Sequence, residues 1–159
     1  SGAVVAQDNG LCLFTGTFQP QVASILDKFP IESMQPGDVY MTNSPYGGGT
    51  HNPDIALIMP IFVDETLIAF GISVTHWTEL GGKVLGSISP DSTEIYQEGL
   101  QFPRLRLYTA GVVNQAIIDI IEANVRLPLM SLGDLKPTGV RRPVPGRGRS
   151  VNAGITIAF

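Results

Sequence analysis

Residues 55–75 read IALIMPIFVDETLIAFGISVT, and the fold is expected to form around them. Two runs within them, Ile55–Val63 and Leu67–Thr75, are rich in β-branched and aromatic residues and nearly continuous in apolar side chains. Such runs are typical of central strands that are buried on both faces. The three residues between them, Asp64–Thr66, form a short turn. We therefore expect an antiparallel central pair, with a bulge or an early end at Pro60.

The elements outside this pair are predicted from shorter patterns. Asn9-Gly10 predicts a hairpin that joins Ala3–Ala6 to Leu11–Phe14. Apolar residues at helical spacing predict one helix that ends at Pro30 and another that spans residues 112–126. Further expected elements are strands at Asp38–Thr42, Leu105–Tyr108 and Val151–Phe159, and a short helix at Asp91–Glu98.

The order of these elements favours the α+β class, because strands and helices do not alternate regularly. We expect a mixed sheet with central buried strands, two or three helices and long loops rich in Gly and Pro. The 159 residues include 18 Gly and 12 Pro, which lie in clusters.

The composition argues against several classes of protein. A hydrophobic fraction of 43% and a net charge of -4 exclude an intrinsically disordered chain. The single cysteine excludes a disulfide framework and a Cys-rich zinc site. Overall acidity argues against a nucleic-acid partner, and no apolar run approaches the roughly 20 residues that span a bilayer. Because no signal segment opens the sequence either, we expect a cytoplasmic protein with no membrane contact.

Charge is distributed unevenly along the chain. All 14 acidic residues precede residue 136, whereas 5 of the 10 basic residues follow residue 135. The stretch Pro137–Ser150 has neither helical nor strand periodicity. We therefore expect one folded, metal-binding portion at residues 1–135 and a basic tail at 136–159. That tail is either a segment with a different role or a distant piece of the same protein.

The two histidines, His51 and His76, each follow a threonine beside a loop. His51 begins the sequence His-Asn-Pro-Asp, which places Asp54 three residues later. If the central strands pair, Asp54 and His76 lie at the same end of the hairpin. Two imidazoles and one carboxylate that meet there suit a divalent metal such as zinc, manganese or iron. The alternative is that the histidines are ordinary loop residues and that Asp54 only begins a strand.

The loops beside these residues contain candidate catalytic and substrate-binding side chains. Glu79 is a candidate general base or a partner that orients an imidazole, and the alternative is a solvated loop acid. Trp77 and Tyr46 are candidate substrate-binding residues, although a single Trp is more often packed in a core. The glycine-rich loop Tyr46–Thr50 lacks the Lys-Ser/Thr of a Walker A loop. Its small residues would instead let the backbone approach the His51 site.

Several motifs occur in the order and at the spacing of one known family. They are VAQ (5–7), PGDV (36–39), NSPYGGGTHNPD (43–54), HWTELGG (76–82), GS (86–87), PDSTEIYQEG (90–99) and ANVRLPLMSLGDL (123–135). Through them, roughly residues 2–135 resemble the hydantoinase B/oxoprolinase family. That family includes N-methylhydantoinase B subunits, 5-oxoprolinases and the metal-binding subunits of acetone and acetophenone carboxylases.

The resemblance implies that His51, Asp54 and His76 are metal ligands. It also implies a partner, a hydantoinase A-type subunit or domain that binds ATP, and hence a hetero-oligomer. The chain departs from the family pattern at Ser44, where an aspartate is usual, and at Trp77, where many members have a second histidine. Family members are also several times longer, and their upstream segment contains a further acidic residue that would complete the coordination.

Three functions are compatible with this resemblance. The first is the metal-binding portion of an ATP-dependent cyclic-amide hydrolase, whose metal activates water and stabilises the oxyanion at the amide carbonyl. The second is the metal-binding subunit of an ATP-dependent ketone carboxylase that acts on acetone or acetophenone. The third is a non-catalytic structural subunit.

Overall fold

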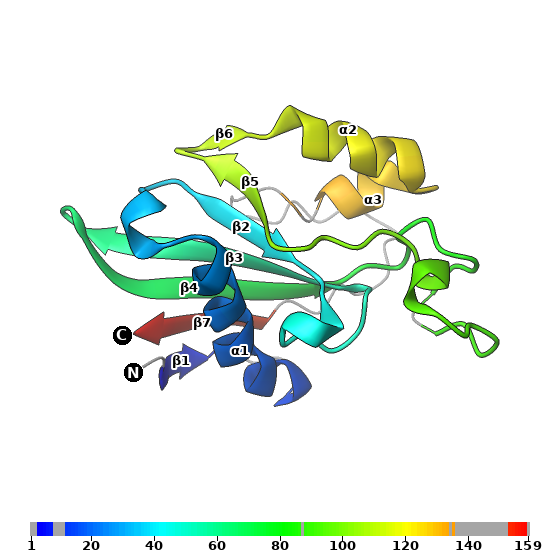
Figure 1. Cartoon of the computed structure of the whole chain (residues 1–159), viewed down its shortest axis with the longest axis horizontal. Helices are drawn as coiled ribbons and strands as arrows, with labels where there is room; N and C mark the ends of the chain where they lie inside the picture. The colour runs from blue at the N-terminus through cyan, green and yellow to red at the C-terminus, as the bar shows by residue number, and fades with distance from the viewer. Residues whose placement is uncertain (1–2, 8–11, 87, 134, 136–152, 159) are drawn as a thin grey trace.

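An antiparallel sheet with helices on both faces forms the frame of the protein (Figure 1). The computed structural model of the chain describes residues 3–7, 12–86, 88–133, 135 and 153–158. The strands are β1 (Ala3–Gln7), β2 (Val39–Thr42), β3 (Asp54–Val63), β4 (Thr66–His76), β5 (Leu105–Thr109), β6 (Val112–Val113) and β7 (Ala153–Ala158). The helices are α1 (Cys12–Lys28), α2 (Gln115–Asn124) and α3 (Pro128–Gly133), with short 3-10 turns η1 (Ile31–Ser33), η2 (Pro45–Gly47) and η3 (Ile95–Glu98).

Strands β3 and β4 form the predicted central pair, and their register runs from Asp54 opposite His76 to Val63 opposite Thr66. The sheet order is β1-β7-β4-β3-β2-β5-β6, so both strands lie in its interior. Pro60 does not end β3, but the register with β4 shifts just after it, between Ile61 and Phe62, which agrees with the bulge expected there. Strand β2 pairs with β3 only as far as Ile58, so the missing N–H of Pro60 breaks no ladder bond on that side.

The α+β class is confirmed, and one detail of the predicted sheet is corrected. Every described strand pair is antiparallel, whereas a mixed sheet was expected. The terminal strand expected at Val151–Phe159 is confirmed as β7, which pairs with both β1 and β4. The basic stretch between residues 135 and 153 lies outside the described residues, so the division into a folded portion and a tail stays a prediction.

Two hydrophobic cores lie on opposite faces of the sheet. Successive residues of a strand point to opposite faces, so Ala56 and Ile58 pack under α1, whereas Ile55 and Leu57 pack against the side that α2 covers. The same alternation assigns Asp54 to the α1 face. The core under α1 comprises Phe14, Phe18, Val22, Ile25, Met34, Tyr40, Ala56, Ile58, Phe70, Ile72 and Val74. The second comprises Met41, Ile55, Trp77, Leu80, Phe102, Leu107, Ile117, Ile121, Val125 and Leu135.

Helix α1 is longer than predicted and replaces the second strand of the expected N-terminal hairpin. β1 pairs with β7, and the chain then enters a helix at Cys12. Phe14 and Phe18 continue the buried stripe of Val22 toward the N-terminus, and the resulting contact with the sheet outweighs the local turn signal. Pro20 lies inside this helix, and it interrupts the pattern by which a helix is normally recognised.

Two other helices differ from their predicted bounds. The helix expected at residues 112–126 is shorter, because β6 takes its first residues and pairs with β5. The helix expected at Asp91–Glu98 is reduced to the 3-10 turn η3. No helix among the described residues is long and apolar enough to cross a membrane.

Candidate metal site

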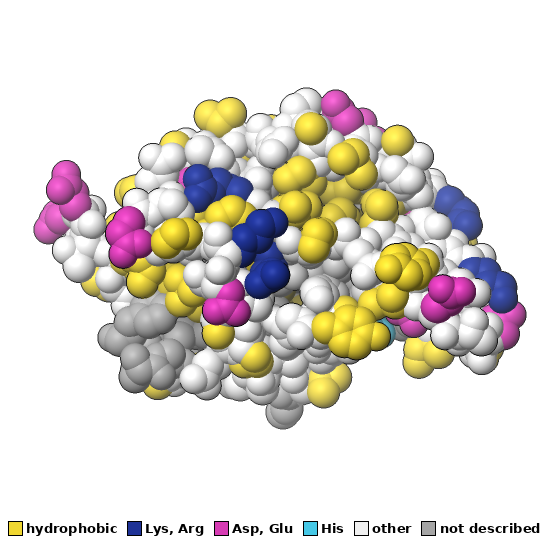
Figure 2. Space-filling model, in the orientation of Figure 1, with side chains coloured by type: hydrophobic (Ala, Val, Ile, Leu, Met, Phe, Trp, Pro, Cys, Tyr) yellow, Lys and Arg dark blue, Asp and Glu magenta, His cyan; other side chains and the backbone are white. Residues whose placement is uncertain are grey.

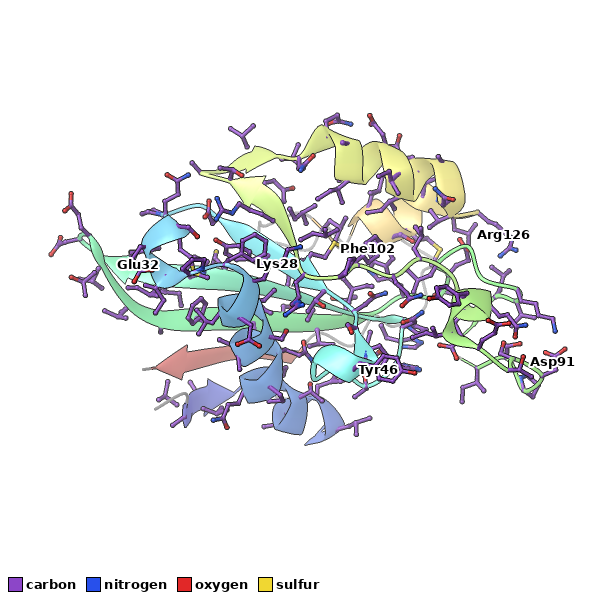
Figure 3. All side chains as sticks on the ribbon, viewed as in Figure 1. Lys28, Glu32, Tyr46, Asp91, Phe102 and Arg126 are labelled. Carbon is purple, nitrogen blue, oxygen red and sulfur yellow. The ribbon has the colours of Figure 1, made fainter. Side chains whose placement is uncertain are left out.

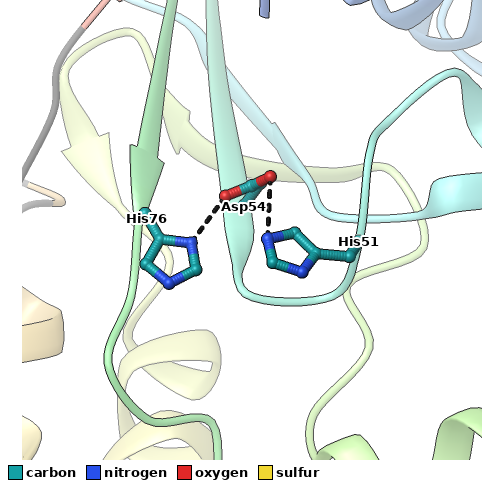
Figure 4. Close-up of side chains that lie close together, drawn as sticks. All are labelled: His51, Asp54 and His76. Carbon is teal, nitrogen blue, oxygen red and sulfur yellow. Dashed lines mark hydrogen bonds and ion pairs between the residues drawn. The ribbon is translucent and has the colours of Figure 1, made fainter. Parts of the chain in front are cut away.

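Asp54 and His76 lie opposite each other because they begin β3 and end β4. The two residues are directly paired in the antiparallel register, so their side chains share one face of the hairpin end. The backbone N–H of Trp77 donates to the carbonyl oxygen of Pro53 at 2.8 Å, which continues the ladder past this pair. Nδ1 of His76 lies 2.8 Å from Oδ1 of Asp54 (Figure 4). This half of the site is therefore fixed by strand pairing.

His51 reaches the same carboxylate from the loop before β3. The backbone N–H of Asp54 donates to the carbonyl oxygen of His51 at 3.0 Å and closes a tight turn. Nε2 of His51 lies 3.0 Å from Oδ2 of Asp54. The rings of His51 and His76 stack with centroids 5.2 Å apart and an interplanar angle of 22°. The predicted convergence of the two loops is thus present in the structure (Figure 4).

The carboxylate of Asp54 is buried and the two imidazoles are partly exposed. Its side chain is 3% exposed, against 35% for His51 and 30% for His76. Burial alone would raise the pKa of Asp54, but hydrogen bonds from His51, His76 and the hydroxyl of Thr50 outweigh burial and hold that pKa below its usual range. The same hydrogen bond to Asp54 raises the pKa of His51, although the burial of His51 acts in the opposite direction.

This arrangement fits a divalent cation. Each of the three residues offers one ligand atom, and these atoms lie within 4.8 Å of one another. Imidazole nitrogen and carboxylate oxygen together suit zinc, manganese or iron. A ligand carboxylate must be ionised, and the lowered pKa of Asp54 keeps it ionised at neutral pH. The partial exposure of both imidazoles leaves the group open to solvent.

The glycine-rich loop turns against α1. Ser44, where the family usually has aspartate, accepts a hydrogen bond from the N–H of Gly47 through its side chain at 3.2 Å. Gly48 has a φ of 97°, and a Cβ there would lie 2.7 Å from Cβ of Pro20. The small residues were expected to let the backbone approach the His51 site, but the close approach at Gly48 is to the helix.

Glu79 lies in the loop after β4, and its carboxylate is bound to neighbours outside the metal cluster. Its side chain is 1% exposed and accepts hydrogen bonds from the backbone N–H groups of Gly81 and Arg126. Nη1 of Arg126 adds an ion pair at 3.1 Å. The solvated-acid alternative is therefore wrong. A general-base role stays a prediction, which these structural contacts do not favour.

The two predicted substrate-binding residues lie in opposite environments. Trp77 is 2% exposed and packs edge-on against Phe102, with ring centroids 6.2 Å apart. This burial corresponds to the core-packing alternative. Tyr46 is 88% exposed and projects from η2 into solvent (Figure 3). On the face shown in Figure 2, hydrophobic side chains lie among charged ones and only a trace of histidine is visible.

Three residues of this region were not predicted from the sequence. Thr50 orients Asp54, Arg126 neutralises Glu79, and Asn43 joins the His51 loop to a distant segment. Thr50 lies four positions before Asp54 and could have been recognised from that spacing. Asn43 and Arg126 act on partners that are distant along the chain, and no local pattern marks them.

Comparison with protein families matches residues 1–138 to the family described as hydantoinase B/oxoprolinase. The sequence is 38% identical over 84 residues to 5-oxoprolinase 1 of Arabidopsis thaliana. This match covers 53% of this chain and 7% of that protein. It is 28% identical over 134 residues to the acetophenone carboxylase delta subunit of Aromatoleum aromaticum. This second match covers 80% of this chain and 19% of that subunit.

The chain is similar in both fold and sequence to a solved structure. The crystal structure of ATP-dependent caprolactamase from Pseudomonas jessenii superposes with a TM-score of 0.69 at 31% identity. The match covers 76% of this chain and 21% of that one. The chain also spans no more than 24% of the length of the first relatives that it matches.

Proposed function

The chain belongs to the hydantoinase B/oxoprolinase family, and from this premise we propose that it supplies the metal site of an ATP-dependent enzyme that hydrolyses cyclic amides. The observation that carries the proposal is the convergence of His51, Asp54 and His76, whose ligand atoms lie within 4.8 Å of one another. The names of the relatives support the substrate class, because caprolactam and 5-oxoproline are both cyclic amides.

His51, Asp54 and His76 would hold the cation. A bound divalent ion supplies Lewis-acid chemistry, because it polarises a carbonyl oxygen and lowers the pKa of water. The chain itself contributes orientation. Asp54 is held by the hydroxyl of Thr50 and by the strand register, so its carboxylate would be positioned before a cation binds.

The rest of the reaction belongs to other parts of the proposed assembly. The loop Tyr46–Thr50 lacks the residues of a Walker A motif, so ATP would bind to a hydantoinase A-type subunit or domain. We accordingly propose a cytoplasmic hetero-oligomer, in which ATP activates the amide before it reaches the metal. The caprolactamase relative is itself described as ATP-dependent.

A ketone carboxylase is the second candidate function, and the acetophenone carboxylase relative favours it. The same three ligands would serve, because the developing charge would again lie on an oxygen, here that of an enolate. The two functions differ in the small molecule that the metal faces and in the need for bicarbonate.

The proposal is tested on the full-length protein purified with its A-type partner. The wild-type complex should contain a divalent metal and hydrolyse hydantoin or 5-oxoproline with ATP, and an Asp54→Asn variant should lose both properties. Asp119→Asn is the matched control, because Asp119 is an exposed acid on α2 that pairs with Gln115. Turnover of acetone or acetophenone with bicarbonate would instead establish the carboxylase. A metal-free complex with full activity would contradict the metal site, and a complex without either activity would support the structural-subunit alternative.

A further inference from the structure

Asn43 directly follows β2, and its buried side chain joins three segments of backbone. It is 1% exposed. Its Nδ2 donates to the carbonyl oxygens of Asn52 and Leu100, each at 2.9 Å. Its Oδ1 accepts from the backbone N–H of Phe102 at 2.6 Å. One amide therefore connects the end of β2, the His51 loop and the segment that enters β5.

These contacts require both halves of an amide. Two of the partners are carbonyl oxygens, which need a donor, and the third is an N–H group, which needs an acceptor. A carboxylate at position 43 would face the oxygens of Asn52 and Leu100 without a proton to offer. An apolar side chain would leave these three backbone groups without the bonds from Asn43, two of which are buried, and this is unfavourable in a protein interior.

The contact with Asn52 bears directly on the metal site. The carbonyl of Asn52 follows His51 in the chain, and Asn52 itself is 0% exposed. His76 is fixed by the β3–β4 register, whereas His51 lies outside any strand and its side chain is 35% exposed. Its position relative to Asp54 therefore depends on how the backbone of the loop is held. The described bonds of the backbone on either side of His51 include the turn to Asp54, the bond from Trp77 to the carbonyl oxygen of Pro53 and the bond from Asn43 to the carbonyl oxygen of Asn52. Of these, the bond from Asn43 is the one made by a side chain to the residue next to His51.

We propose that Asn43 is a positioning residue that sets the distance between His51 and the Asp54–His76 pair, and so the affinity of the site for a divalent cation. This inference rests on the proposed metal site. Residues that orient metal ligands in this way typically change metal affinity by about 10- to 100-fold when they are replaced. The proposed role goes beyond general stability, because Asn43 also holds the backbone next to one of the three proposed ligands.

The test compares two substitutions of similar size at the two ends of β2, Asn43→Asp and Asp38→Asn, in the full-length protein. Asp38 is a matched control, because it is 0% exposed and accepts hydrogen bonds from Gln35, Tyr40 and Ala110 at the end of β2 away from the site. Both variants should unfold at a lower temperature than the wild type. Only Asn43→Asp should bind Zn²⁺ or Mn²⁺ about 10- to 100-fold more weakly in a chelator competition.

The direction of the change in metal affinity in Asn43→Asp distinguishes an effect of loop geometry from an effect of charge. A new carboxylate near the site would by charge alone attract a cation more strongly, so weaker binding must come from the displaced loop. The visible spectrum of bound Co²⁺ should also change in Asn43→Asp and stay the same in Asp38→Asn, because it reports coordination geometry. Asn43→Ser, whose smaller polar side chain leaves room for a bridging water, should lose less affinity and provides the comparison if Asn43→Asp does not fold.

Two results would overturn the inference, and they are distinguishable. If Asn43→Asp, or Asn43→Ser in its place, binds the metal with wild-type affinity and an unchanged Co²⁺ spectrum, Asn43 is only structural and the metal site stands. If the wild-type protein binds neither Zn²⁺ nor Mn²⁺, the proposed function fails and the inference fails with it.

Discussion

Glu79 and Arg126 form an ion pair in which the carboxylate is buried and the guanidinium is half exposed. Nη2 of Arg126 also donates to the carbonyl oxygen of Gly82 at 2.9 Å, and the hydroxyl of Ser131 lies 3.5 Å from the carbonyl oxygen of Glu79. These contacts join the loop after β4 to Arg126, which lies between α2 and α3, and to Ser131 in α3. The pair therefore fixes the path of the chain that leaves His76.

Replacement of Glu79 by glutamine should reduce the free energy of unfolding by about 1–3 kcal/mol. The neutral amide would lose the ion pair and would turn an N–H₂ group toward the N–H donors of Gly81 or Arg126. Urea unfolding of the metal-free protein measures the change. Glu122→Gln on the exposed face of α2 is the control and should stay within about 0.5 kcal/mol. Lost activity with unchanged stability would instead support the general-base role of Glu79.

Two glycine substitutions should change stability in opposite directions. Gly48→Ala places a Cβ 2.7 Å from Cβ of Pro20 at a φ of 97°, so it should destabilise the protein by more than about 1 kcal/mol. Gly16→Ala meets nothing within 4 Å and lies in α1, so it should stabilise the protein by roughly 0.5–1 kcal/mol. Thermal unfolding of both variants checks the pair. If Gly48→Ala and Gly16→Ala changed the unfolding temperature by the same amount, the close contact between Gly48 and Pro20 of α1 would be contradicted.

The central hairpin and the convergence of His51, Asp54 and His76 were predictable because their signals are local. Two apolar runs separated by a short turn define the pairing of β3 with β4, and this pairing alone places Asp54 opposite His76. The spacing of His51 from Asp54 then suffices for one tight turn. Each step uses residues that are close in the sequence or aligned by one register.

The predictions were wrong where the structure depends on contacts between segments that are distant in the sequence. β1 pairs with β7, which lies at the other end of the chain, and α1 begins at Cys12, so the predicted pairing of Ala3–Ala6 with Leu11–Phe14 is wrong. The burial of Trp77 and Glu79 depends on α2 and on Arg126, and no pattern within the HWTELGG motif reveals these partners. A loop acid and a core acid look the same in sequence until the opposing cation is located.

The phenol of Tyr40 should make stability fall at high pH. Burial, together with the hydrogen bond to Asp38, raises the pKa of Tyr40 to about 12. Between about pH 10 and that value the folded state keeps a proton that the unfolded state releases, so the free energy of unfolding decreases as pH rises. This contribution is complete below about pH 10, and its loss amounts to about 2–3 kcal/mol.

The comparison with Tyr40→Phe isolates this titration from that of lysines and arginines. The variant loses the hydrogen bond to Asp38 and should be less stable than the wild type at neutral pH. The difference between the two proteins should shrink as pH rises from about 10 to about 12. Urea unfolding across this range measures it, and a constant difference would contradict the raised pKa.

Thr50→Val should weaken metal binding while keeping the shape of the site. The hydroxyl of Thr50 donates to Oδ2 of Asp54, the oxygen that also faces Nε2 of His51. Valine has a similar volume and no donor, so the carboxylate of Asp54 would lose one of the three side-chain hydrogen bonds that orient it, and its pKa would rise. A loss of affinity of about 10- to 100-fold is expected, because Thr50 holds a proposed ligand in place.

The stabilisation that added metal gives to the folded state makes this loss measurable. At a Zn²⁺ concentration about 100 times the wild-type Kd, bound metal should stabilise the wild type by about 2.7 kcal/mol. A tenfold weaker Thr50→Val variant should gain only about 1.4 kcal/mol at the same concentration. Thr78→Val is the matched control, because Thr78 is exposed and lies two residues after His76. Equal gains in Thr50→Val and Thr78→Val would show that Thr50 does not orient the ligand, because only its hydroxyl contacts Asp54.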